Sequence, residues 1–278
     1  MTFWDHLEVL RKSIFRIAGI LLVSTVALFF FKNFLFDDVV LAPTAKDFPL
    51  YRLLGLDFSL QLVNIEVAAQ FMIHMKVTFL CALILTFPFL IFEVWKFIAP
   101  ALYDNEKKAV RGAFSFASTL FYVGIAVGYM IVLPIMLNFF ADYQVSSAIP
   151  NTFSLSSYIS LFTSTVLTFG IVFEFPTVIV ALSALGVITR ETLRKYRRHA
   201  ICIIAILAAV ITPTGDPFSL MVCSVPIYLL YEFSILLCRK GSDESSDSED
   251  IEEQVENDKK DEYVEEYVEE YEEEYEED

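Results

Sequence analysis

The chain has 278 residues, of which 56% are apolar, and 27 of them are phenylalanine. A soluble domain of this length carries less apolar side chain, so the composition excludes an ordinary soluble enzyme or binding domain. The formal net charge of −16 is concentrated at the C-terminus, where residues 241–278 hold 21 of the 36 acidic residues and only two lysines. The remainder of the chain is mildly basic, as expected for a protein with loops beside anionic lipid.

Six apolar runs approach the roughly 20 residues that a helix needs to cross a bilayer. Lysine and arginine cluster before the first run and after the second, fourth and sixth, whereas the alternate loops carry few. Since basic loops stay on the cytoplasmic side, this asymmetry places both termini in the cytoplasm. The sequence therefore predicts an all-α polytopic membrane protein with six transmembrane helices, at about 15–34, 71–98, 112–140, 157–185, 199–211 and 217–236.

The fifth and sixth runs are short. Thirteen residues separate Arg198 from Thr212, and 15 separate Asp216 from Glu232. Helices of those lengths span only about 20 and 22 Å, against about 30 Å of hydrocarbon. They predict local thinning of the bilayer, unless both helices extend beyond the apolar runs.

The chain divides by composition into a six-span domain, 1–240, and an acidic tail, 241–278. Dense like charge prevents a packed core, so the tail is predicted to be disordered and solvated. At the other end, Thr2–Arg11 has an apolar face and is predicted to form an interfacial helix.

Glu174 lies well inside the fourth run, two residues before Pro176. A charged group near the bilayer centre costs about 2.5–3.5 kcal/mol, so it must face protein or a water-filled cavity, or be protonated. Pro176 adds to the local polarity, because a proline inside a helix frees backbone carbonyls. Two interpretations remain: a structural carboxylate paired within the bundle, or one that lines a functional polar cavity.

Other residues have local explanations when taken singly. Glu106 resembles an exposed loop carboxylate near a helix start, and Asp216 resembles a turn or N-cap residue. Gly124 and Gly128 form a small-xxx-small pair typical of helix packing. The three histidines are scattered and the four cysteines stand singly, so we expect no catalytic site, metal site or cofactor.

Five motifs, in order along the chain, together resemble the TatC family, the core subunit of the twin-arginine protein translocase. Each is weak alone, but the ordered set covers nearly the whole chain except the tail. They are His6–Arg11, Phe92–Tyr103 followed by Glu106, Phe173–Pro176, Ala208–Asp216 and Leu229–Glu232.

The resemblance implies six helices in a glove-like concave bundle in the bacterial inner membrane. It implies binding of twin-arginine signal peptides of folded proteins at the cytoplasmic face, and export driven by the proton-motive force. The implied partners are TatA-type and possibly TatB-type single-span proteins, precursor proteins, membrane lipids and further copies of the chain, with no nucleic acid.

The resemblance also assigns residues. Those matching the signal-peptide-binding region are Phe97, Glu106, Glu8 and Arg11, and Glu174 matches the intramembrane carboxylate. Those matching the outer hairpin and first loop are Asp216, Pro213 and Pro43.

One motif departs from the family pattern, in which a glutamate usually occupies the position of Val9. Here the acidic residue is Glu8, and adjacent helical positions point about 100° apart. Either Glu8 compensates for the missing glutamate, or it forms an (i, i+4) pair with Lys12. A smaller departure is Leu220, where the family often has a polar residue.

Two other functions remain open from sequence. A secondary transporter of small solutes predicts inverted repeats, but the sequence of spans one to three shows no similarity to that of spans four to six. A purely structural scaffold is disfavoured by an ionisable residue at Glu174.

Overall fold

The computed structural model describes residues 3–56, 58–101, 104–146, 148–149, 151–212 and 215–238. For some helical residues among these, Glu106 included, only the main chain is described. The acidic tail and Pro213 lie outside the described residues. Residues 1–239 form one compact unit, and it is the unit described below.

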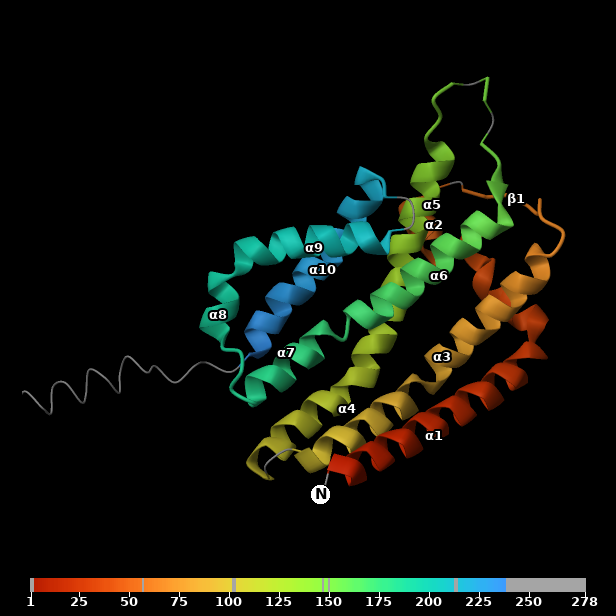
Figure 1. Cartoon of the computed structure of the whole chain (residues 1–278). Helices are drawn as coiled ribbons and strands as arrows, with labels where there is room; N and C mark the ends of the chain where they lie inside the picture. Colours follow the sequence, from red (N-terminus) through yellow and green to blue (C-terminus); the bar gives the residue numbers. More distant parts are fainter. Residues whose placement is uncertain are drawn as a thin grey trace, which may run out of the picture. The chain divides into compact units, whose positions relative to one another are not determined.

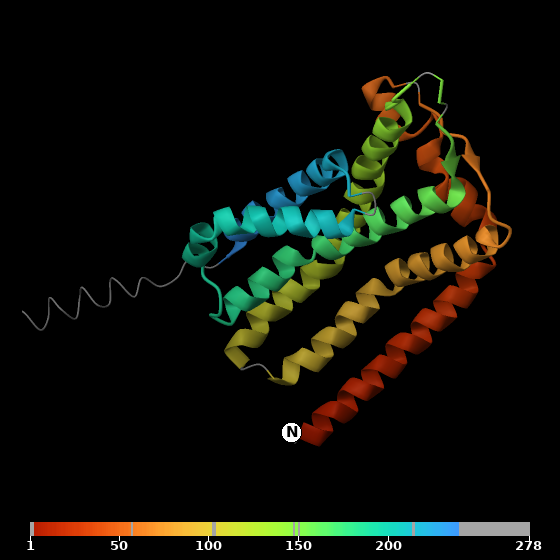
Figure 2. The same cartoon turned by 45° about the horizontal axis from the view of Figure 1, so that its top comes forward.

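The first half of this unit contains two long helices and an irregular loop between them (Figure 1). The long helices are α1 (Phe3–Phe29) and α3 (Ala69–Ile98), and α1 runs alongside α3 in Figure 1 and Figure 2. The loop between them contains η1 (Phe34–Val40), η2 (Ala42–Thr44), α2 (Pro49–Leu54) and β1 (Leu62–Val63).

The second half begins after the short η3 (Ala99–Ala101), and its first two spans are built from broken helices. The first comprises α4 (Asp104–Val127), η4 (Gly128–Val132) and α5 (Leu133–Asp142), and the second comprises α6 (Leu155–Val172) and α7 (Phe175–Ala184). The remaining elements are β2 (Phe153–Ser154), α8 (Arg190–Lys195), α9 (Arg197–Ile211) and α10 (Pro217–Leu237).

Five helical segments within the described residues are long and apolar enough to cross a membrane: Leu7–Phe29, Ala69–Ile98, Phe116–Asp142, Leu155–Ser183 and Pro217–Leu237. The predicted fifth span is α9, and its 15 residues confirm that this helix is short. The predicted shortness of the sixth span is wrong, because α10 has 21 residues, enough for about 31 Å. It continues past Glu232, whose charge is paired with Arg197 at 2.6 Å.

The stretch predicted to be an interfacial helix is helical from Phe3 and continuous with the first span. Helix α1 runs without interruption from Phe3 to Phe29, so the N-terminal segment and the first span are one element. No proline interrupts this stretch, and the one glycine in it, Gly19, has open space around it. Nothing in the sequence therefore stops the helix between the interface and the bilayer.

Prolines account for the irregular points of the spans. Pro176 has no N–H to donate to Val172, and α6 ends at Val172. Likewise, Pro88 inside α3 leaves the Ile84 carbonyl without its helical donor, and the Tyr122 hydroxyl of α4 donates to that carbonyl at 3.0 Å. A neighbouring helix thus satisfies the backbone group that the proline frees.

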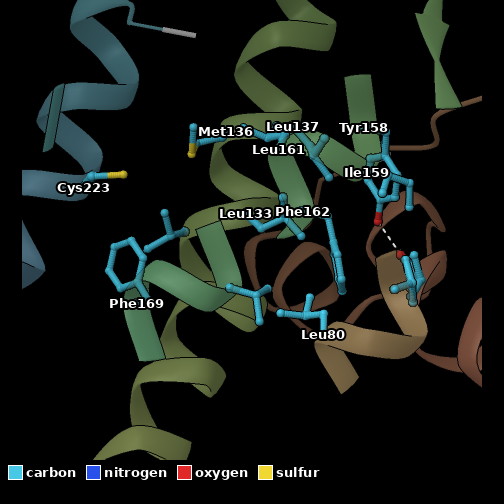
Figure 3. Close-up of a cluster of buried hydrophobic side chains, with 14 of the residues drawn as sticks. Leu80, Leu133, Met136, Leu137, Tyr158, Ile159, Leu161, Phe162, Phe169 and Cys223 are labelled. Atoms are coloured by element: carbon cyan, nitrogen blue, oxygen red, sulfur yellow. Dashed lines mark hydrogen bonds between the residues drawn. The ribbon is translucent and has the colours of Figure 1, made fainter. Parts of the chain in front are cut away.

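Close packing of α4 against α6 depends on two glycines, as their spacing predicted. A Cβ added at Gly124 would lie 2.4 Å from the Phe169 carbonyl oxygen, and one at Gly128 would lie 2.9 Å from Phe169 Cβ. Around this crossing lies the main apolar core, part of which Figure 3 shows. Its members include Leu133, Met136, Ile159, Phe162 and Phe169.

The loop end of the unit, defined as the connections 30–68, 143–154 and 212–216, is held to the helices by tyrosines. The Tyr129 hydroxyl donates to the Val39 carbonyl at 2.8 Å. The Tyr158 hydroxyl donates to the Val40 carbonyl, the dashed line that leaves Tyr158 in Figure 3. The strand β1 also pairs in parallel with β2, with Leu62 opposite Phe153. The first loop is therefore docked on both broken spans.

Candidate functional site

The start of α1, the end of α3 and the start of α4 form what we call the N-terminal end of the unit (Figure 1). Here a buried carboxylate joins two helices. Glu93 of α3 is 3% exposed, and its Oε2 accepts from Ser13 Oγ of α1 at 2.8 Å and from Arg16 Nη2 at 2.7 Å. Arg16 also donates to Ser13 Oγ at 3.1 Å. These contacts fasten the N-terminal part of α1 to α3.

Phe97 and Glu106, the two loop residues of the predicted signal site, lie on either side of one short connection. Phe97 is half-buried in the last turn of α3, and Glu106 lies in the first turn of α4. The rings of Trp95 and Phe114, 5.2 Å apart, link α3 and α4 beside this connection. The fold therefore brings Phe97 and the main chain of Glu106 to the same end of the unit.

Glu8 and Arg11 lie near the start of α1, and both are exposed. The Glu8 carboxylate contacts Lys12 Nζ at 2.9 Å, with side chains 55% and 63% exposed respectively. This is the (i, i+4) pair that was one of the two interpretations of Glu8. Val9 is half-buried, and its helical position is about 100° round α1 from that of Glu8.

Glu174 occupies the break between α6 and α7 and is half-buried. Its Oε1 is buried near the Thr177 side chain one turn later, and neither Glu174 Oε1 nor Thr177 Oγ1 makes a hydrogen bond of ordinary geometry with the described residues. An adjoining cavity of about 350 Å³ is lined by Pro176 and Thr177 of α7 together with residues of α4 and α10. The other lining residues are apolar or glycine, namely Gly112, Phe116, Leu120, Val180, Phe233 and Leu237, and Glu174 does not itself line the cavity. A functional polar cavity at Glu174 therefore stays a prediction.

Asp216 and Pro43 lie at the loop end, far along the sequence from one another. Asp216 caps α10, because its Oδ1 accepts from the Ser219 main-chain N–H at 2.8 Å. Pro43 is buried in η2, and its carbonyl accepts from the Tyr51 hydroxyl at 3.0 Å. Burial raises the pKa of the Tyr51 phenol above its usual range, so this hydroxyl stays protonated as a donor. Both residues thus have structural roles at this end.

Two ion pairs were missed from sequence. Glu93 lies inside the predicted second span, and the cost argument that singled out Glu174 applies to it equally. The other pair joins Arg197 of α9 to Glu232 of α10, whose second oxygen accepts from Tyr228 at 3.1 Å. This pair fastens α9 to α10.

Comparison with known proteins agrees with this architecture. Residues 5–226 match the family model described as "Sec-independent protein translocase protein (TatC)". The TatC protein of Blattabacterium sp. subsp. Periplaneta americana is 38% identical over 252 residues, which cover 85% of this chain and 94% of that protein. The TatC protein of Deinococcus radiodurans is 34% identical over 236 residues, which cover 85% of each chain.

A solved structure extends the likeness to three dimensions. A crystal structure titled "Twin Arginine Translocase Receptor- TatC in DDM" superposes with a TM-score of 0.71 at 30% identity, covering 84% of this chain and 99% of that one. The family model, the relatives and the solved fold all agree with the family resemblance of the sequence. The chain is a multi-pass membrane protein that belongs to the TatC family of Sec-independent protein translocase proteins.

Proposed function

We propose that this chain is the signal-peptide receptor subunit of a twin-arginine translocase. The observation that carries the proposal is the TatC match over residues 5–226, which includes α1, the α3–α4 connection and the α6–α7 break. A secondary transporter of small solutes is not carried further, because the matched proteins are protein translocase subunits.

The proposed signal-binding surface is the N-terminal end of the unit. Its proposed contacts are Glu106, Phe97, Glu8 and Arg11. The two arginines of the signal peptide bind best to carboxylates that accept two hydrogen bonds from each guanidinium group. Lysine cannot form this bidentate contact, so it is a poor substitute for arginine in the signal peptide. Exposure of Glu8 and the position of Glu106 at a helix start support access from solution.

The proposed orientation places this surface in the cytoplasm of a bacterial cell, with the membrane being the inner membrane. Basic residues after α3 and α7 support it. The loop end, with Asp216, Pro213 and Pro43, is then periplasmic.

The proposed partners within the membrane are TatA-type proteins, TatB-type proteins where the complex contains them, and further copies of this chain. Glu174 and its adjoining cavity are proposed to act after precursor docking, with the proton-motive force driving transport.

Replacement of Glu106 tests the proposal directly. Glu106→Gln removes the charge and keeps the size, and we expect it to weaken binding of a twin-arginine precursor by about 1.5–3 kcal/mol, the range for a hydrogen bond to a charged group. The amount of protein in the membrane is measured in parallel and should stay normal. The matched control is Glu191→Gln on α8, outside the proposed surface. Unchanged export of a twin-arginine cargo by Glu106→Gln would remove the assignment.

A further inference from the structure

Glu93 is a buried charged residue to which the proposed function assigns no role. It lies in α3 five residues before Ile98, about 7.5 Å of helix from the N-terminal end of the unit. A carboxylate so placed is costly unless it is paired and hydrogen-bonded. Its pairing is therefore the feature to explain.

The pairing is made through one oxygen. Both Ser13 Oγ and Arg16 Nη2 contact Glu93 Oε2, at 2.8 and 2.7 Å. Arginine binds carboxylate most strongly when two parallel N–H groups meet two oxygens, and this contact is not of that kind. The Arg16 side chain is also 44% exposed, whereas that of Glu93 is 4% exposed. The Arg16 side chain therefore lies between the Glu93 carboxylate and the protein surface, and part of that side chain is exposed.

The covered carboxylate shares a helix face with the proposed signal site. Phe97 follows Glu93 by four residues, so the two side chains leave α3 on the same side. On α1, Ser13 and Arg16 share a face with Val9, which precedes Ser13 by one turn. The ion pair of Arg16 with Glu93 therefore lies next to the proposed signal-binding surface that contains Phe97.

From this geometry we infer that Glu93 is a guanidinium site that Arg16 fills in the resting protein, and that an arginine of the signal peptide displaces Arg16 from it. Arg16 is then an internal competitor. The inference rests on the proposed function and adds a specific residue to it. The exchange replaces one guanidinium by another, so Glu93 stays paired throughout, and Ser13 keeps its hydrogen bond. Arg16, already half-exposed, moves into solvent.

The two partners of the pair make opposite predictions. Removal of the competitor by Arg16→Gln should tighten binding of a signal peptide, at least about threefold, whereas Glu93→Gln should weaken it roughly tenfold or more. The double variant should bind like Glu93→Gln, because the competitor has no effect once its site is gone. A plain structural link between α1 and α3 would instead make both single variants bind worse.

The experiment measures fluorescence anisotropy of a labelled peptide containing two consecutive arginines, titrated with the full chain in lipid nanodiscs. A peptide with two lysines is the specificity control. Arg197→Gln is the matched control variant, since it breaks the other ion pair, between α9 and α10, and should leave binding unchanged. Arg16→Lys is included because it keeps a cation beside Glu93 and so protects folding. Lysine is a weaker competitor than arginine, so Arg16→Lys should also tighten peptide binding, but by less than Arg16→Gln.

Equal or weaker binding by both Arg16→Gln and Arg16→Lys, with normal thermal unfolding, would overturn the inference. So would full affinity in Glu93→Gln. If the wild-type chain fails to bind the twin-arginine peptide in preference to the twin-lysine peptide, the proposed function itself fails. If it binds selectively and Glu106→Gln weakens binding while the Arg16 variants change nothing, only the role of Glu93 is lost.

Discussion

The closeness of α4 to α6 gives the most quantitative prediction. In Gly124→Ala the new Cβ would lie 2.4 Å from the Phe169 carbonyl oxygen and 2.7 Å from Phe173 Cβ. Ordinary contacts at these positions are more than 3 Å, and the oxygen belongs to a helix backbone that cannot rotate away. The two helices must therefore move apart, so we expect the free energy of unfolding to fall by about 1–3 kcal/mol, the usual cost of overpacking.

The control for this variant is Gly19→Ala in α1, where an added Cβ meets nothing within 4 Å. Alanine is favoured over glycine inside a helix by about 0.5–1 kcal/mol, so Gly19→Ala should be neutral or stabilising. Thermal unfolding of the purified chains in detergent, followed by circular dichroism, measures both. A melting temperature of Gly124→Ala equal to or above that of Gly19→Ala would refute the packing argument.

Three further predictions concern topology and the site. A reporter fused after Gln144 should read extracytoplasmic and one after Thr192 cytoplasmic, and the reverse at either site would contradict the orientation. Glu174→Ala should leave precursor docking intact and impair a later step of transport, whereas loss of folded protein would favour a structural carboxylate. Glu8→Ala should weaken binding of a twin-arginine peptide by more than about 0.2–0.5 kcal/mol, the value of an exposed helix pair, and adding Val9→Glu should restore binding. Equal affinity in the wild type, Glu8→Ala and the double variant would exclude Glu8 from the signal site.

Hydropathy predicted most of the fold, because bilayer thickness fixes the length of an apolar run and leaves few alternatives. The break before Pro176 was not predicted, because the apolar run 157–185 indicated one continuous helix, whereas the missing donor of proline ends α6 at Val172. The predicted bounds of the sixth helix, 217–236, agree with α10, but the expectation that its membrane-spanning part stops at Glu232 was wrong. Glu232 looked like the end of a span, and only the spatial partner Arg197, 35 residues earlier, lets the helix continue past it.

The site was predicted in part. Phe97 and Glu106 lie on either side of the α3–α4 connection, and their role in signal binding stays a prediction. The pair of Glu8 with Lys12 is a local spacing that the sequence reveals. Glu93 was missed for a physical reason. Its partners, Ser13 and Arg16, are about 80 residues earlier in the chain. No local pattern joins those positions, and only the packing of α1 on α3 brings them together.

The most direct test of the receptor role is site-specific cross-linking. A photoreactive amino acid at Lys107, the neighbour of Glu106, in the membrane-embedded chain is illuminated with a folded precursor that carries a twin-arginine signal. The account predicts a cross-link to the signal peptide that is strongly reduced when both arginines are replaced by lysine. Equal cross-linking of the twin-arginine and twin-lysine precursors, or none with either, would contradict it.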